Sequence, residues 1–360
     1  MNAFQKMTKT KNNLTNRESN ANALIGFIRT LFAIRERKLL YTFFLFALFS
    51  CEKEINIKIP EYEPKLVIEG VIESSGVTGA PPIVILTKSS AYFEETDLNA
   101  IQNLFVHDAI VTVEDGNTTS TLEELCLNDL DSTIAPLVAS YFGINEQDLS
   151  TFNYCVYTVP FVDLISGNHL KGEVGKTYKL TVESEGNTYT ASTEIPQLVP
   201  LDSVWFEVQI QDTLGFAWAR MTDPTGRGNA YRWFAKRITL DANGEPKDDN
   251  FIAPFGSAFN DEFVDGVSFD FAYDRGHPPT GHENEPGEVD HYYKIGDTIV
   301  VKFTTIDNDV YEYMRLYEVQ INSNGSPFAS PANVPTNIEG GALGLWAGYG
   351  ATYDTLFAVK

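Results

Sequence analysis

The sequence predicts a mainly β protein with two β-sandwich-like domains, a short helical insertion in the first and one helix in the second. Three observations predict this fold class. The 360 residues include 24 Phe and 17 Tyr but only 4 Met, a composition that favours strands. Alternating or β-branched segments recur at short intervals, as in antiparallel sandwiches rather than βαβ units. Gly-bearing turns follow several of these segments.

The chain divides into consecutive regions. We predict a lipoprotein-type signal peptide with a long n-region over 1–50, a lipidated tether over 51–63, an N-terminal β-sandwich-like domain over 64–198 with a helical insertion over 94–150, and a C-terminal β-rich domain over 199–360. Pro196 and Pro200 interrupt the strand pattern near the boundary between the two domains.

Each domain contains several segments with strand patterning. In the first domain, 177–183 and 187–193 alternate on either side of Ser184-Glu-Gly186, which predicts a hairpin. The remaining predicted strands are 66–73, 82–87, 109–116, 203–211, 215–221, 230–239, 298–305 and 352–360. The stretches 241–250 and 274–290 are predicted to be polar loops, and Pro278-Pro279 and Pro286-Gly287 mark the second as solvated.

Helical spacing is confined to a few stretches. Residues 128–142 and 94–104 predict short helices within the insertion. Val310, Tyr313, Leu316 and Val319 recur every third residue, which predicts a helix over 308–322.

The N-terminus has the pattern of an export signal. Residues 39–50 are uncharged and mostly apolar, the right length for a secretory signal and too short to cross a bilayer. Arg35, Arg37 and Lys38 precede this run, and Leu48-Phe-Ser-Cys51 follows the pattern of a bacterial lipobox, although Phe is unusual before the small residue. We therefore predict lipidation of Cys51. The alternative is a buried N-terminal helix that ends in Cys.

The charge of the chain excludes one class of partner and defines the role of the anchor. Net charge is −23, and no basic stripe occurs, so binding to nucleic-acid phosphates is not expected. The first 50 residues hold 8 of the 26 Lys and Arg and 2 of the 49 Asp and Glu, so cleavage before Cys51 leaves 310 residues with net charge −29. Such a body repels anionic lipid. Attachment would therefore depend on the acyl chains.

The two other cysteines form an even pair in a compartment that permits disulfides. Cys126 and Cys155 predict a disulfide, with two free buried thiols as the alternative. No Cys-x-x-Cys spacing supports a metal or redox site.

The order of short motifs from Cys51 to Lys360 resembles a family of Bacteroidota outer-membrane lipoproteins of unknown function, often encoded beside TonB-dependent receptors. The matching segments are Lys65–Gly70, Gly175–Val182, Tyr189–Pro196, Asp223-Pro224, Asn229–Arg232, Gly296-Asp297, Tyr311–Tyr313, Pro327-Phe328, Pro331 and Asn337–Gly344. The resemblance implies location at the outer membrane, a β-rich fold and a TonB-dependent receptor as a neighbour. It supplies no catalytic residues. Glu52-Lys-Glu54 also resembles the signal that directs such lipoproteins to the cell surface. The alternative is an ordinary charged tether.

Candidate chemistry in the sequence is sparse. His277, His282 and His291 lie among acidic residues and are weak candidates for a metal site, because their spacing matches no familiar zinc motif. His107 and His169 are isolated and more typical of structural roles. No Gly-x-Ser-x-Gly or calcium-loop motif occurs, and no cofactor is predicted.

Two further patterns have both a functional and a structural interpretation. Gly340-Gly-Ala-Leu-Gly344 lacks the Lys of a phosphate-binding loop, so we expect it to serve tight packing or a turn. The aromatic residues of the second domain fit a carbohydrate platform or, more often, a sandwich core. They are Trp205, Phe206, Trp218, Tyr231, Trp233 and Phe234.

These observations predict a non-enzymatic outer-membrane lipoprotein that is an accessory or ligand-capture subunit of a TonB-dependent receptor. The alternatives are a self-standing carbohydrate- or peptide-binding surface lipoprotein and an envelope hydrolase with an unrecognised site. The ligand is not predicted.

Overall fold

A computed structural model describes residues 62–90, 102–131, 135, 153–277, 286–323 and 333–360. The chain separates into two compact units, Met1–Glu61 and Tyr62–Lys360, and all described residues belong to the second. The fold is mainly β, as predicted. No described helix is long and apolar enough to span a membrane.

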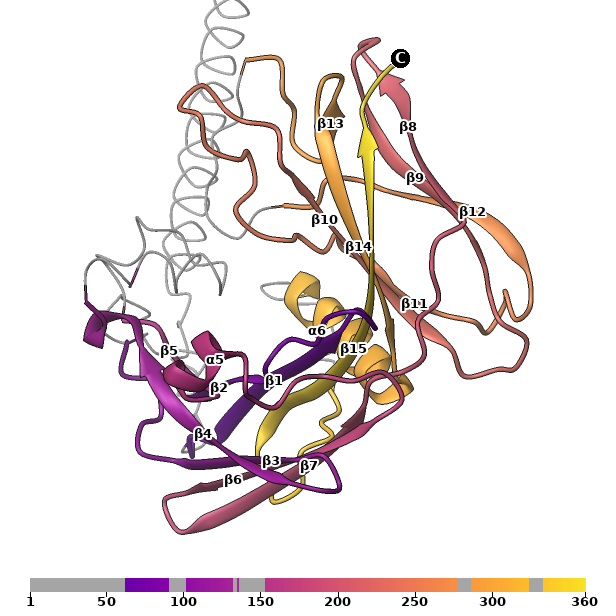
Figure 1. Cartoon of the computed structure of the whole chain (residues 1–360). Helices are drawn as coiled ribbons and strands as arrows, with labels where there is room; N and C mark the ends of the chain where they lie inside the picture. The colour runs from indigo at the N-terminus through magenta and orange to yellow at the C-terminus, as the bar shows by residue number, and fades with distance from the viewer. Residues whose placement is uncertain (1–61, 91–101, 132–134, 136–152, 278–285, 324–332) are drawn as a thin grey trace, which may run out of the picture. The chain divides into compact units, whose positions relative to one another are not determined.

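An eleven-stranded sheet runs through both halves of the described chain in the order β11-β10-β14-β15-β1-β2-β5-β4-β3-β6-β7 (Figure 1). Its strands are β1 (Leu66–Ser74), β2 (Ile83–Lys88), β3 (Ile110–Glu114), β4 (Thr119–Cys126), β5 (Cys155–Thr158), β6 (Thr177–Ser184), β7 (Asn187–Glu194), β10 (Ala230–Arg237), β11 (Ala258–Asn260), β14 (Thr298–Ile306) and β15 (Leu343–Phe357). A second sheet contains β8 (Ser203–Ile210), β9 (Leu214–Thr222), β12 (Ser268–Tyr273) and β13 (Tyr293–Lys294).

The long strand β15 connects the two halves. Its first part pairs with β1 in parallel, and its second part pairs with β14 antiparallel. In the first half the sheet folds over, so that the indole N–H of Trp346 on β15 donates to the Tyr178 carbonyl on β6 at 3.0 Å. The prediction of a strand over 352–360 found only the end of β15, because 343–351 is too rich in Gly and Ala for a β-propensity signal.

Glycines allow β15 to lie close to its neighbours. A Cβ on Gly344 would lie 2.0 Å from the Ile68 carbonyl oxygen, and one on Gly348 would lie 2.2 Å from the Glu194 carbonyl oxygen. The Gly-rich motif over 340–344, whose last two residues begin β15, is therefore a packing and turn element, as expected.

Three hydrophobic clusters form the core, and β15 contributes to each. The first lies within the folded sheet around Ile68, Val113 and Trp346. The second lies between β10, β14 and the small sheet, around Trp233 and Phe303. The third lies under helix α6 (Asn308–Ser323), around Tyr313. The division into domains 64–198 and 199–360 stays a prediction, because Tyr62–Lys360 clusters as one compact unit.

Two local predictions are confirmed. β6 and β7 form the predicted hairpin, whose turn residues Glu185 and Gly186 both have positive φ, as a tight hairpin turn requires. The helix over 308–322 is α6. The described part of the predicted insertion holds β3, β4 and the 3-10 turn η1 (Leu127–Asp129), and α5 (Phe161–Ser166) follows it. Residues 94–101 and most of 128–142 lie outside the described residues.

Candidate functional site

One face of the main sheet gathers aromatic and basic side chains. Alternation along β10 buries Tyr231 and Trp233 in the core and places Arg232, Phe234 and Lys236 on the opposite face. The strand register places Phe234 opposite Lys302 of β14, and Lys302 opposite Tyr353 of β15. We call this surface the aromatic–basic face. Its residues are Glu73, Arg232, Phe234, Lys236, Phe251, Lys302, Tyr349 and Tyr353.

An ion pair surrounded by aromatic rings lies at the centre of this face. The Lys302 ammonium pairs with the Glu73 carboxylate, and both side chains are largely buried. The same ammonium lies 5.2 Å from the ring centroid of Phe234, 5.8 Å from that of Phe251 and 5.7 Å from that of Tyr349. At these distances the ring faces attract the cation. The rings and the carboxylate thus hold Lys302 in one position.

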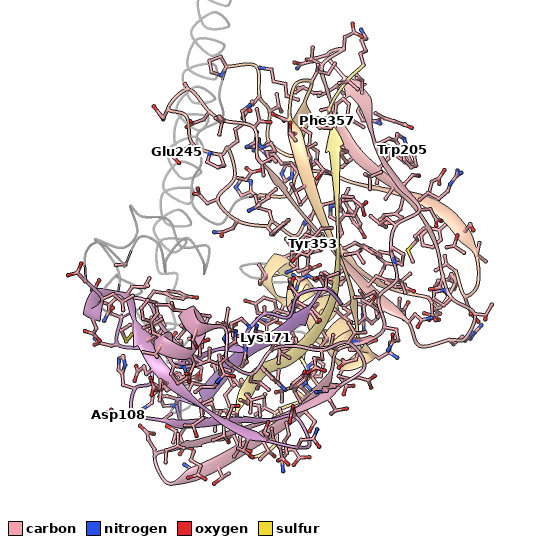
Figure 2. The ribbon with its side chains drawn as sticks, viewed as in Figure 1. Asp108, Lys171, Trp205, Glu245, Tyr353 and Phe357 are labelled. Atoms are coloured by element: carbon pink, nitrogen blue, oxygen red, sulfur yellow. A yellow bond between two sulfur atoms is a disulfide. The ribbon has the colours of Figure 1, made fainter. Side chains whose placement is uncertain are left out.

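Tyr353 provides an exposed ring beside this ion pair. Its side chain is 47% exposed, and its hydroxyl donates to Glu73 Oε1 at 2.5 Å. Figure 2 labels it on β15. Partial burial, with the charge of Glu73, raises the pKa of Tyr353, so the hydroxyl stays protonated. The ring is therefore fixed at its polar end and open to contact along its side.

Two cations on the face form no ion pair with a described carboxylate. The Arg232 guanidinium lies 4.9 Å from the Phe234 ring centroid, contacts the Met314 sulfur at 2.7 Å, and has a buried Nε without a hydrogen-bond partner among described atoms. The Lys236 ammonium lies 4.9 Å from the Phe251 ring centroid. Three cations and one carboxylate give this face a net charge of +2.

The next carboxylate on this side of β1 is farther along the strand. Glu69 is four residues from Glu73, which corresponds to about 13 Å. Burial raises the pKa of Glu69, and its charge acts on Tyr313 and Tyr317 of α6. The charge of Asp307 also acts on Tyr349 of the face, so the positive charge of the aromatic–basic face is local and bordered by acidic groups.

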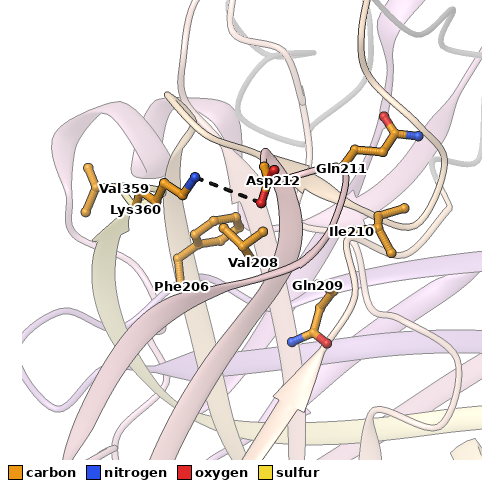
Figure 3. A pocket seen from close by; sticks show the side chains of 8 residues that line it. All are labelled: Phe206, Val208, Gln209, Ile210, Gln211, Asp212, Val359 and Lys360. Carbon is orange, nitrogen blue, oxygen red and sulfur yellow. Dashed lines mark ion pairs between the residues drawn. The ribbon is translucent and has the colours of Figure 1, made fainter.

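An open pocket of about 500 Å³ lies where the β8–β9 turn meets the C-terminal residues (Figure 3). Phe206, Val208, Ile210 and Val359 supply apolar surface, and Lys360 pairs with Asp212 at 4.0 Å. Both charged side chains are well exposed, and such a pair contributes little binding energy. Gln209 and Gln211 add polar surface to the same lining.

Three carboxylates meet at a turn after β9. Ligand oxygens of Asp223, Asp261 and Asp265 lie within 4.8 Å of one another. Asp261 accepts two backbone N–H groups, at 2.8 and 3.0 Å, and Asp265 accepts that of Gly226 at 2.7 Å. Asp223 accepts the Tyr231 hydroxyl at 2.5 Å. Oxygen donors of this kind suit Ca²⁺, and the hydrogen bonds also explain the cluster as a turn-forming unit.

The predicted histidine site is described only in part. The rings of His277 and His291 stack at 5.8 Å, and His291 Nδ1 lies 3.2 Å from Asp274 Oδ2. His282 lies outside the described residues. His107, which is isolated in the sequence, pairs with Glu124.

The interpretation of 274–290 as a solvated loop is wrong in part. Glu288 is buried, and its Oε1 accepts Arg237 Nη1 at 2.9 Å and Lys247 Nζ at 2.6 Å. Asp248 and Arg275 are buried in the same network. The sequence does not show this because each residue finds its partners in a different loop or strand.

The two cysteines of the predicted disulfide lie on neighbouring strands of the main sheet. Cys126 of β4 and Cys155 of β5 are directly opposed and joined by a sulfur–sulfur bond of 2.01 Å. Cys51 lies outside the described residues, so its lipidation stays a prediction.

The aromatic residues singled out in the sequence separate into different places. Tyr231 and Trp233 are fully buried, Trp205 stacks on Trp218 at 6.1 Å, and Phe234 alone joins the aromatic–basic face. Sequence reasoning missed the other members of this face. The usable signal was the Arg-x-Phe-x-Lys alternation at 232–236.

Comparison with known proteins identifies a family but no activity. No curated protein matches the chain. The model of a family described as a domain of unknown function, DUF4249, matches residues 52–354. This confirms that the resemblance seen in the sequence is to a family of unknown function. The chain belongs to the DUF4249 family.

Proposed function

We propose that this protein is a lipid-anchored, non-enzymatic subunit of the bacterial outer membrane that captures a ligand for a TonB-dependent receptor. The observation that carries the proposal is the sequence over 35–51, where a basic flank and a 12-residue uncharged run lead into Cys51. The folded body follows at Tyr62. The aromatic–basic face is the ligand site that we assign to this role.

The strongly acidic body supports an acyl anchor. A mature chain with net charge −29 gains nothing from anionic headgroups, so stable attachment needs the lipid chains. The family resemblance supports the Bacteroidota source, the outer-membrane address, the exposure at the cell surface and the receptor partner.

A first experiment tests the anchor. Cys51→Ala should move the protein from the membrane fraction to the soluble fraction and abolish incorporation of labelled fatty acid. Ser50→Ala, which keeps a small residue before the cysteine, should remain anchored. Membrane retention of Cys51→Ala without acylation would contradict the proposal.

A second experiment tests the partner. Extraction of the native membrane with a mild neutral detergent should co-purify an outer-membrane barrel with the protein. Recovery of the lipoprotein alone would favour the second candidate, a self-standing binding lipoprotein. That candidate has support from the aromatic–basic face, because the face needs no second protein to be complete.

A further inference from the structure

We propose that the aromatic–basic face binds an acidic oligosaccharide, with the carboxylates of its sugars on Arg232 and Lys236 and a sugar ring on Tyr353, while Lys302 stays paired with Glu73. This inference rests on the proposed ligand-capture function and names the ligand class. The first argument is charge complementarity. A chain with 49 acidic and 26 basic residues concentrates three cations and one carboxylate on this surface.

The cations are arranged as a line rather than a point. Arg232 and Lys236 are four residues apart on β10, about 13 Å along the strand. Lys302 lies on the neighbouring strand in the row between them, opposite Phe234. A ligand that reaches both ends must be longer than one sugar ring and must carry more than one anionic group.

The rings orient the cations and leave one stacking surface. Phe234 and Phe251 each lie beneath two cations, so these ring faces hold the basic side chains in place. Tyr353 lies in the same cross-strand row and is 47% exposed. Its ring can pack against the apolar C–H face of a sugar, since an aromatic body with a fixed polar end suits such contacts.

The strand pairing and the overall charge favour a sugar over two other anionic partners. β10 pairs with β11 and β14, and β14 pairs with β10 and β15, so neither strand offers an open edge to an acidic peptide. An anionic membrane would meet the whole acidic body and not only this face. Recognition therefore depends on side chains that contact a short, separate ligand.

Isothermal titration of the mature lipoprotein in neutral detergent tests the inference. The probes are oligogalacturonate, an uncharged malto-oligosaccharide of equal length, an oligoglutamate peptide and phosphatidylglycerol vesicles. Oligogalacturonate should bind, and the neutral sugar should bind at least tenfold more weakly. Equal binding of the two sugars, or tighter binding of the peptide or vesicles, would overturn the ligand class.

Variants locate the site. Lys236→Gln should weaken oligogalacturonate binding about tenfold, the loss expected for one charged hydrogen bond, and Tyr353→Leu should weaken it through loss of stacking. Lys179→Gln removes an exposed charge from β6 and should leave the affinity unchanged. Lys236 has no ion pair with a described carboxylate, so its loss should not unfold the protein, which circular dichroism checks.

The outcomes separate this inference from the function on which it rests. If Lys236→Gln binds as tightly as Lys179→Gln, the site assignment fails. If a barrel co-purifies but no probe binds, the ligand class fails and the capture function stands. If the probes bind as expected but no barrel co-purifies, the ligand class stands and the receptor partner fails.

Discussion

Replacing Glu288 by Gln should destabilise the protein by about 3–5 kcal/mol, the usual cost of removing one partner from a buried ion pair. The side chain is 1% exposed and accepts Arg237 Nη1 at 2.9 Å and Lys247 Nζ at 2.6 Å. Arg275 Nη1 lies 3.6 Å from its second oxygen. The amide keeps the volume but removes the charge, so three buried cations lose a shared buried carboxylate, while Asp248 and Asp297 remain beside Arg237 and Lys247.

The pH dependence of stability gives a second estimate of this magnitude. Burial alone would raise the pKa of Glu288, but the Lys247 hydrogen bond and the Arg237 charge outweigh it and lower the pKa from 4.5 to about 2. A lowered folded-state pKa contributes stability that is present above about pH 4.5 and is lost as the pH falls towards 2. The shift corresponds to about 3 kcal/mol.

Urea unfolding at pH 7 and at pH 3, followed by tryptophan fluorescence, measures both effects. The exposed Glu245→Gln, in a nearby loop, is the matched control and should change stability by less than about 0.5 kcal/mol. Glu288→Gln should also reduce the difference in stability between pH 7 and pH 3. If Glu288→Gln unfolds at the same urea concentration as Glu245→Gln, the network is not a stabilising unit and the reasoning is refuted.

Three other predictions test the fold. Mass spectrometry without reduction should show Cys126 linked to Cys155, and removing the bond should cost about 2–4 kcal/mol; two alkylatable thiols would rule it out. Gly348→Ala should cost about 1–3 kcal/mol by overpacking, because the new Cβ would lie 2.2 Å from the Glu194 carbonyl, and an unchanged melting temperature would contradict that packing. Trp346→Phe should cost about 1–3 kcal/mol in thermal unfolding, because the buried Tyr178 carbonyl loses its 3.0 Å donor; a neutral result would show that another donor replaces it.

The sequence predicts those elements whose signal is local. The hairpin at 184–187 was predictable because Gly186 and its flanking alternation lie within a few residues, and α6 because its apolar period is sustained over its length. β15 was found only at its end. Its first part owes its strand conformation to pairing with β1, nearly 280 residues earlier, rather than to its own Gly- and Ala-rich composition.

The candidate site shows the same limit. The alternation Arg232, Phe234, Lys236 could be read from β10 alone, but alternation does not say which neighbouring strands complete a face. Lys302 and Tyr353 join it through the register of β14 and β15, and Glu73 through the parallel pairing of β1. The local net positive charge follows from that pairing and is hidden in a composition that is strongly acidic overall.

This contrast between local and total charge predicts an unusual salt dependence for oligogalacturonate binding. At 0.01 M salt the Debye length is about 30 Å, so the whole acidic body repels the ligand. At 0.15 M it is about 8 Å, which screens the distant carboxylates while contacts to Arg232 and Lys236 persist. Affinity should therefore rise between these concentrations and fall towards 1 M, where the length is about 3 Å. Titration over this range measures the effect, with the neutral sugar as control. A steady fall from the lowest salt would show that the face alone governs the interaction.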